Sequence, residues 1–406
     1  MNKSVQLFNT CKCANSCFTD PSAQIASYTL TDLFRKHGYP SEGHYATTDD
    51  GYILRLDRVP RPGAPAVLVG SPLTCGSACY VGLEKDSLAF KLHDAGYDVW
   101  LGNFRGSGLS TNHTHLKVTD NEFWNYSFHE HGALDIPAMV DYILHTTRLQ
   151  SLAYVGHSMG STSFLVTAAV RPEYDTRIHG AFLMGPVASL ADHKLSPLLS
   201  VLHAFENVTT NVEDSFGPHI LPGSDFLLRF LGGLVCRAFV PSDKPNFNCL
   251  PLNVVGYFLG GAGKVVYPAD FQHYVPSGVA IMEINHYAQL ANPHWPGFRQ
   301  YNHGPTKNRQ LYGQNSPPDY DLTSGNFPVF LYTGKSDIFV TKQNLEFLRI
   351  SFRNFRKLYT VPDKSFGHLD FVLNPEASAL YDDMIDDLNS LLREQQESKR
   401  SRADVN

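Results

Sequence analysis

Short apolar runs that end in glycine alternate with segments of helical periodicity along much of the chain. Runs of about four apolar residues are too short for a helix, and the glycine after each run marks a turn, so the runs predict buried strands. The predicted strands are Ala66–Val69, Asp98–Leu101, Leu152–Val155 and Gly180–Met184, and the predicted helices are Leu83–Ala95, Ile136–Thr147 and Ser161–Val170. This alternation is typical of an α/β fold with a mostly parallel sheet flanked by helices.

The alternation is interrupted once and then resumes. Residues 189–322 are rich in Gly, Pro, Phe and Leu without a clear period, which predicts a domain inserted into the α/β unit. After it, strands are predicted at 328–332 and 357–361 and helices at 342–352 and 375–394. The expected organisation is a disordered N-terminal segment (1–27), a core (28–188 and 323–392), a mainly helical cap or lid insertion (189–322) and a disordered tail (393–406).

The composition narrows the range of partners. Hydrophobic residues make up 43% of the 406 residues and charged residues 18%, so the chain can bury a large core. A net charge of -6 leaves no basic footprint for phosphate groups, which argues against nucleic acid as a partner. Phe226–Val240 is among the most apolar stretches but contains two arginines, and no stretch reaches the roughly 18 uncharged residues of a membrane-spanning helix. We therefore expect a globular protein without a transmembrane segment.

The N-terminus, the cysteines and the glycosylation sequons bear on the compartment. The first 27 residues lack the apolar stretch of a secretory signal, so no signal peptide is expected in this sequence. Seven cysteines permit at most three disulfides and form no zinc-binding pattern, which predicts no metal site. Sequons favour a glycoprotein only if the chain enters the secretory pathway, and they begin at Asn2, Asn112, Asn125 and Asn207.

The pentapeptide Gly156–Gly160 carries the clearest chemical signal. It has the form Gly-x-Ser-x-Gly, in which small residues two before and two after the serine allow a sharp turn that exposes the Ser158 hydroxyl. In a chain with 31 glycines the pattern alone also fits an ordinary glycine-rich turn. A predicted strand leads into it and a predicted helix follows, as a nucleophile on a strand-to-helix turn requires. We therefore interpret Ser158 as a catalytic nucleophile.

A serine nucleophile needs a histidine base and an acid that orients it. In this type of fold the acid follows a late strand and the histidine comes after the acid. Asp337 follows the strand at 328–332 and His368 follows the strand at 357–361, so these residues are the predicted acid and base. The alternatives are that Asp337 caps the next helix and that His368 is an ordinary loop histidine. Competing acids are Asp319, Asp321 and Asp363.

Several further motifs lie in order along the chain. They are His37–Glu42, Thr48–Leu54, Asp86–Phe90, Ala95–Asn103, Phe128–Tyr142, Gly156–Gly160 and His368–Phe371. Together they resemble the acid lipase family of gastric and lysosomal acid lipases, over about residues 28–392. The resemblance implies an α/β-hydrolase core with a cap inserted near Met184, and it places the nucleophile, acid and base at Ser158, Asp337 and His368. It also implies hydrolysis of triacylglycerols or cholesteryl esters by a secreted or lysosomal protein, and Cys236 and Cys249 resemble a cap disulfide.

One part of the chain departs from the family's pattern. The family's oxyanion loop reads His-Gly-Leu after a strand, whereas this chain has Gly70-Ser71-Pro72-Leu73 there. In the family the leucine N–H and the N–H after the nucleophile, here that of Met159, bind the oxygen of the tetrahedral intermediate. Proline has no N–H. Either Leu73 supplies the missing donor through a one-residue shift, or turnover is weak.

The sequence therefore predicts a serine carboxylic ester hydrolase, a lipase, that cleaves lipid esters at a lipid–water interface through an acyl-enzyme. This chemistry needs neither a metal nor an organic cofactor. The alternative is a lipase-derived lipid-binding or storage protein with little turnover because of Pro72. Apolar segments in the predicted cap, Phe226–Leu231 and Leu250–Leu259, either line an acyl channel or simply pack within the cap.

Overall fold

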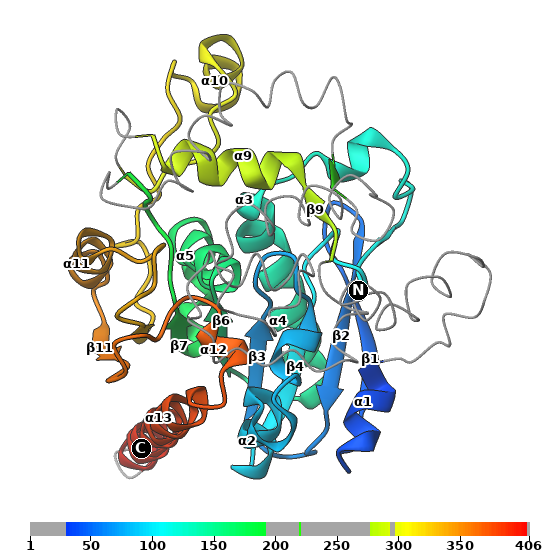
Figure 1. Cartoon of the computed structure of the whole chain (residues 1–406), viewed down its shortest axis with the longest axis vertical. Helices are drawn as coiled ribbons and strands as arrows, with labels where there is room; N and C mark the ends of the chain where they lie inside the picture. The colour runs from blue at the N-terminus through cyan, green and yellow to red at the C-terminus, as the bar shows by residue number, and fades with distance from the viewer. Residues whose placement is uncertain (1–29, 192–218, 221–276, 293–296, 404–406) are drawn as a thin grey trace, which may run out of the picture.

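A computed structural model describes residues 30–191, 219–220, 277–292 and 297–403 (Figure 1). The main sheet in this part of the chain has the strand order β1-β2-β4-β3-β6-β7-β10-β11, with β5 paired to β2. From β4 to β11 in that order neighbouring strands are parallel, while β2 is antiparallel to β1, β4 and β5. The strands are β1 (Glu42–Thr47), β2 (Tyr52–Val59), β3 (Ala66–Gly70), β4 (Asp98–Gly102), β5 (Asn112–His113), β6 (Leu152–His157), β7 (Ile178–Met184), β10 (Val329–Thr333) and β11 (Phe355–Thr360).

Helices cover both faces of this sheet, which explains why its central strands are buried at every position and mostly apolar. Side chains alternate between the faces: Val67 and Val69 belong to one buried cluster and Leu68 to the other. The first cluster includes residues of α1 (Leu30–Lys36), α2 (Leu88–Asp94), α12 (Asp370–Leu373) and α13 (Ala377–Ala403). The second includes residues of α3 (Phe128–Glu130), α4 (Ile136–Thr147), α5 (Met159–Val170) and α11 (Lys342–Ser351). The predicted α/β fold with a mostly parallel, helix-flanked sheet is confirmed.

The interruption predicted from the sequence lies between β7 and β10. Its described parts include β8 (His219–Ile220), β9 (Val279–Ala280), α9 (Ile281–Leu290) and α10 (Pro305–Tyr312). Helix α9 lies above α3 and α5 in the view of Figure 1, and its His286 ring stacks on Phe128 of α3 with centroids 3.8 Å apart. The apolar segments 226–231 and 250–259 and the cysteines at 236 and 249 lie outside the described residues. No described helix is both long and apolar enough to span a membrane.

Two helix boundaries differ from those predicted. Helix α13 continues to Ala403 instead of ending near Glu394, so residues 393–403 of the predicted disordered tail are helical. This stretch lacks Gly and Pro and is rich in Arg, Gln, Glu and Lys, which are good helix formers. The helix predicted over 83–95 is instead a 3₁₀ turn, η2 (Glu84–Asp86), followed by α2. The hydroxyl of Ser87 accepts a hydrogen bond from the Leu83 N–H at 2.9 Å. This bond closes the 3₁₀ turn η2 and separates it from α2.

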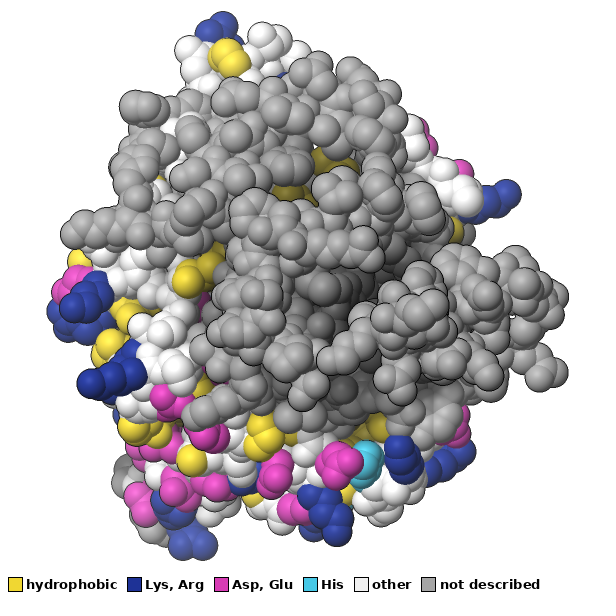
Figure 2. Space-filling model, in the orientation of Figure 1, with side chains coloured by type: hydrophobic (Ala, Val, Ile, Leu, Met, Phe, Trp, Pro, Cys, Tyr) yellow, Lys and Arg dark blue, Asp and Glu magenta, His cyan; other side chains and the backbone are white. Residues whose placement is uncertain are grey.

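The surface of the described residues carries charges of both signs. Along the lower edge of the face in Figure 2, acidic and basic side chains are interspersed, in keeping with the small net charge. The sequon residues Asn112 and Asn125 are exposed, whereas those at 2 and 207 lie outside the described residues.

Candidate active site

Ser158 occupies a sharp turn between β6 and α5. Its backbone has φ 54° and ψ −116°, a conformation that an L residue adopts only at a cost of about 1 to 3 kcal/mol. The glycines on either side make the turn sterically feasible: a Cβ atom on Gly160 would lie 2.3 Å from the Gly70 oxygen, and one on Gly156 would lie 2.7 Å from the Ser161 nitrogen. The result is a partly exposed Ser158 hydroxyl between buried neighbours.

Three predicted residues meet at the carboxyl edge of the sheet. His368, in the loop after β11, has its Nε2 atom 2.7 Å from the Ser158 Oγ atom. Its Nδ1 atom lies 2.8 Å from the Oδ2 atom of Asp337, in the loop after β10. An ionised carboxylate can only accept, so Nδ1 carries the proton and Nε2 keeps the lone pair that accepts from the serine hydroxyl. This is the arrangement that a histidine needs to remove a proton from serine.

The contacts of Asp337 bear on the alternative that it caps the next helix. Helix α11 is capped by Thr341, whose side chain accepts from the Asn344 N–H at 3.0 Å, so Asp337 is not the cap. The second oxygen of Asp337 accepts from the Phe339 N–H at 2.9 Å, which fixes the carboxylate.

The competing acids have other partners. The Asp319 carboxylate lies 2.6 Å from the Arg299 Nε atom, and the Asp321 carboxylate accepts from the Thr323 N–H and hydroxyl. The Asp363 carboxylate accepts from the Ser365 N–H at 2.8 Å. Among these four aspartates, only Asp337 has a hydrogen bond to His368 in the described part of the chain.

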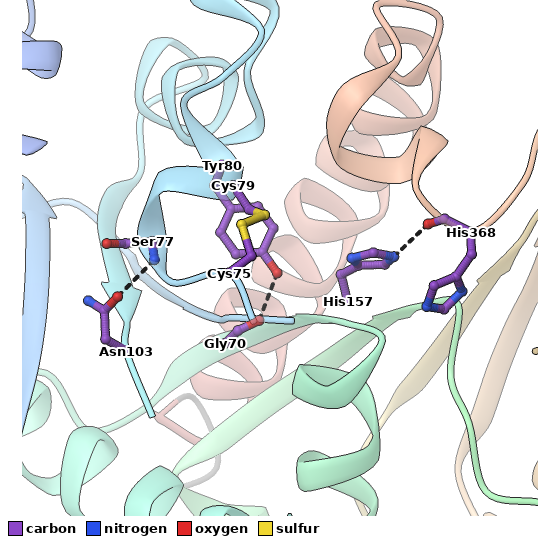
Figure 3. Close-up of a disulfide and its surroundings, with 8 residues drawn as sticks. All are labelled: Gly70, Cys75, Ser77, Cys79, Tyr80, Asn103, His157 and His368. Atoms are coloured by element: carbon purple, nitrogen blue, oxygen red, sulfur yellow. Dashed lines mark hydrogen bonds between the residues drawn. A yellow bond between two sulfur atoms is a disulfide. The ribbon is translucent and has the colours of Figure 1, made fainter. Parts of the chain in front are cut away.

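His157, next to the nucleophile, also contacts His368. Its Nε2 atom lies 2.9 Å from the His368 backbone oxygen, as Figure 3 shows. Burial, together with the nearby His368 ring, lowers the pKa of His157 well below its usual range, so the ring is neutral. Since a carbonyl only accepts, the single ring proton of His157 sits on Nε2 and is donated to the loop that carries His368.

Gly185, directly after β7, has no side chain and so leaves space for the loops that carry Asp337 and His368. Its φ is +54°, and a Cβ atom there would lie 3.1 Å from the Cε1 atom of His368 and 3.2 Å from the Oδ2 atom of Asp337. Any larger residue would be strained in its own backbone and would press on both side chains. On the other side, the Phe339 ring meets the His368 imidazole edge to face, with centroids 4.8 Å apart.

The loop after β3 lies against the turn that carries the serine. The close approach of the Gly70 carbonyl to Gly160 puts the two segments in direct contact. Two tyrosine hydroxyls fix this approach: Tyr80 donates to the Gly70 oxygen at 2.7 Å, and Tyr154 donates to the Gly160 oxygen at 2.8 Å. The segment predicted to bind the oxyanion therefore begins beside the nucleophile.

The two predicted oxyanion donors lie on this loop and on α5. Met159 is the first residue of α5, where a backbone N–H has no acceptor within the helix. Leu73 is half-buried, and its N–H donates to no acceptor in the part of the chain that the structure describes. Both N–H groups therefore lack a competing partner among the described residues, as oxyanion donors require.

Sequence reasoning missed three features of this region: the bond from His157 to the His368 carbonyl, the tight fit at Gly185, and a disulfide between Cys75 and Cys79. The sequence marks a turn at Gly185, but it does not show that Gly185 lies against the loops that carry Asp337 and His368. No group of three or more His, Cys, Asp or Glu residues suited to a metal ion occurs among the described residues.

The strand order, the turn at Ser158 and the loops after β10 and β11 define an α/β-hydrolase. In agreement, residues 76–375 match the family model of the alpha/beta hydrolase fold. A soluble variant of monoglyceride lipase from Saccharomyces cerevisiae has a similar fold, with a TM-score of 0.51 at 17% identity over 86% of this chain and 95% of that one. The fold therefore assigns the protein to the α/β-hydrolases.

More specific similarity lies in the sequence. Residues 30–81 match the partial alpha/beta-hydrolase lipase region. Lipase 1 of Drosophila melanogaster is 33% identical over 352 residues, which cover 86% of this chain and 76% of that protein. Gastric triacylglycerol lipase of Rattus norvegicus is 30% identical over 381 residues, covering 90% of this chain and 92% of that protein. The chain belongs to the acid lipase family, and the resemblance stated from its motifs is confirmed.

Proposed function

We propose that the protein is a serine carboxylic ester hydrolase that cleaves lipid esters, with Ser158, His368 and Asp337 as nucleophile, base and acid. The observation that carries this proposal is the continuous chain of hydrogen bonds from the Ser158 hydroxyl through His368 to Asp337, at 2.7 Å and 2.8 Å. Such a chain activates a hydroxyl that is otherwise a poor nucleophile.

The reaction follows from the positions of the protons. The Ser158 Oγ atom attacks the ester carbonyl while the Nε2 atom of His368 takes the hydroxyl proton, and Asp337 holds the resulting imidazolium through Nδ1. The N–H groups of Met159 and Leu73 donate to the negative oxygen of the tetrahedral intermediate. His368 then gives the proton to the departing alcohol, and a water that it activates cleaves the acyl-enzyme.

The proposal of a lipid ester as substrate is supported by relatives that carry the name of lipases, one of them a triacylglycerol lipase. We expect a triacylglycerol or sterol ester presented at a lipid–water interface. A secreted or lysosomal glycoprotein is the corresponding proposal for the compartment, and the exposed Asn112 and Asn125 are then candidates for glycosylation.

The second candidate is a lipid-binding or storage protein with little turnover. It is favoured by one observation, Pro72, which lacks an N–H in the loop that is expected to bind the oxyanion. Loss of one oxyanion donor typically lowers turnover by about 10² to 10³-fold. The intact hydrogen-bond chain at Ser158 favours the hydrolase.

Burst kinetics with a chromogenic ester distinguish the two candidates. The wild type is expected to release one equivalent of alcohol per molecule in a burst, and Ser158→Ala is expected to lower turnover by about 10⁴-fold or more. Ser163→Ala is the matched control, because Ser163 lies in α5, close after the turn at Ser158, and its buried hydroxyl has no partner among the described residues. A wild type without any Ser158-dependent release contradicts the hydrolase and supports the binding protein.

Substrate class needs a second measurement. Hydrolysis rates for triacylglycerols and sterol esters of increasing acyl length, measured at pH 5 and pH 8, are expected to favour long chains in emulsified form. Equal rates for short dissolved esters and long emulsified ones contradict a lipase and indicate a general esterase.

A further inference from the structure

A buried disulfide lies two residues beyond Leu73. Cys75 and Cys79 are bonded, with Cα atoms 5.9 Å apart, and both residues are at most 5% exposed. The bond links the end of the loop after β3 to the 3₁₀ turn η1 (Ser77–Tyr80), as Figure 3 shows. The proposed mechanism assigns no role to these two cysteines.

The turn at one end of the disulfide is firmly attached to the sheet. The Ser77 N–H donates to the Asn103 side-chain oxygen at 2.8 Å, and the Ser77 hydroxyl donates to the Asp57 carboxylate at 2.6 Å. The Tyr80 hydroxyl donates to the Gly70 oxygen at 2.7 Å, and Figure 3 shows this contact beside the disulfide. Cys79 therefore belongs to a segment fixed at several points to buried groups.

The segment at the other end has few backbone contacts of its own. Thr74 has a φ of +60°, a left-handed conformation that a non-glycine residue keeps only when its surroundings hold it there. Its carbonyl accepts from the Ser277 N–H at 2.6 Å, and the Cys75 N–H donates to the Pro72 oxygen over a long 3.4 Å. The disulfide at Cys75 thus adds a covalent cross-link between the end of this segment and η1.

We propose that the Cys75–Cys79 disulfide positions the backbone N–H of Leu73 as the second oxyanion donor. The inference rests on the proposed hydrolase function and explains how the loop works without a donor at Pro72. Proline fixes its own φ, Thr74 supplies a left-handed bend, and the disulfide holds the end of that bend against η1. The two cysteines are positioning residues, because they act through the loop and do not touch the ester.

The inference predicts a specific kinetic defect when the disulfide is opened. An oxyanion donor acts mainly on the transition state, so its displacement lowers kcat and leaves KM nearly unchanged. We expect Cys75→Ser/Cys79→Ser to lower kcat by about 10²-fold with KM within about twofold. Affinity for a trifluoromethyl ketone, which forms a tetrahedral oxyanion on Ser158, is expected to fall by a similar factor.

Chemical reduction of the wild type tests the positioning role of the disulfide without replacing either cysteine. A phosphine attacks one sulfur and breaks the S–S bond, and one water molecule then hydrolyses the phosphorus–sulfur adduct. The products are two thiols and the phosphine oxide, with water supplying the oxygen of the oxide and the two protons. The folded wild type is expected to lose kcat under this treatment and to regain it on reoxidation with diamide. The double serine variant shows no further response, which separates this disulfide from the other cysteines of the chain. If the double variant does not fold, reduction of the wild type alone tests the inference, with the loss of kcat compared with the thiols formed at Cys75 and Cys79.

The outcomes separate the inference from the function on which it rests. If the wild type hydrolyses esters through Ser158 but kcat is unchanged after both thiols have been titrated, the disulfide has no positioning role. A parallel change in kcat, KM and melting temperature shows a merely structural bond and also overturns the inference. If the oxidised wild type shows no Ser158-dependent hydrolysis, the proposed function itself fails.

Discussion

Glu283 offers a prediction about the attachment of the insertion to the core. This α9 residue is 2% exposed; one carboxyl oxygen accepts from the Ala280 N–H at 2.8 Å, and the other lies 3.7 Å from the Nε2 atom of the buried His131. Burial raises the pKa of Glu283 to about 8, reinforced by the nearby Asp135 and Glu130 and opposed by the Ala280 N–H and the Arg105 guanidinium. Burial also lowers the pKa of His131 well below its usual range, so the pair is neutral and not ionic near pH 7.

The sign and size of the effect on stability follow from these values. The folded-state pKa of Glu283 lies above the ordinary 4.5, so its contribution to stability is complete below about pH 4.5 and is lost as the pH rises towards 8. Over the window from pH 5 to pH 8 the loss is at most about 4 kcal/mol, since one pKa unit corresponds to about 1.4 kcal/mol. Glu283→Gln keeps a neutral acceptor and cannot ionise, so it removes this pH dependence.

Urea unfolding of the wild type and Glu283→Gln at pH 5, 6.5 and 8 measures the effect. The difference in free energy of unfolding between the two proteins is expected to shift in favour of the variant as the pH rises. Glu346→Gln serves as a control, because Glu346 is exposed on α11 and lies next to Arg349. A difference that shifts in favour of the wild type at high pH refutes the reasoning, because it indicates an ionised Glu283 paired with a charged His131.

Two further predictions concern the site. Asp337→Asn is expected to lower kcat by about 10⁴-fold, because the amide no longer holds the productive tautomer of His368. Asp321→Asn is the control: Asp321 has no hydrogen bond to His368, so ester hydrolysis is expected to be unchanged. Gly185→Ala is expected to lower kcat by about 10²-fold by displacing His368. Gly38→Ala, at a glycine with a similarly positive φ but open space around it, is expected to leave kcat unchanged. Equal losses of kcat in the two variants contradict a displacement of the imidazole.

Much of the fold could be predicted because each central strand is a short apolar run closed by a glycine. The same glycines mark the carboxyl edge of the sheet, so residues that follow them, such as Ser158 and Asp337, were recognisable as candidates. The choice of Asp337 over Asp319 could not be made from local sequence alone. It depends on which carboxylate the loop after β10 brings to His368 and which one Arg299 already pairs with.

Other features depend on contacts between segments that are distant in the chain or on the local turn geometry. Cys75 and Cys79 are joined because a 3₁₀ turn follows Gly76, and their spacing of four fits no familiar disulfide framework. The partner of His157 is a carbonyl that arrives from the last quarter of the chain. The end of the last helix was missed because its charged composition fits both a solvated helix and a disordered tail.

The contact between Ser158 and His368 joins positions 210 residues apart. A ribosome therefore completes the serine and its turn long before it adds the imidazole, and a nascent chain that stops short of position 368 holds one without the other. Products of interrupted translation are inert under the proposed chemistry. Under that proposal, a chain gains the capacity to cleave esters only after β11 and the loop that carries His368 have been made and folded.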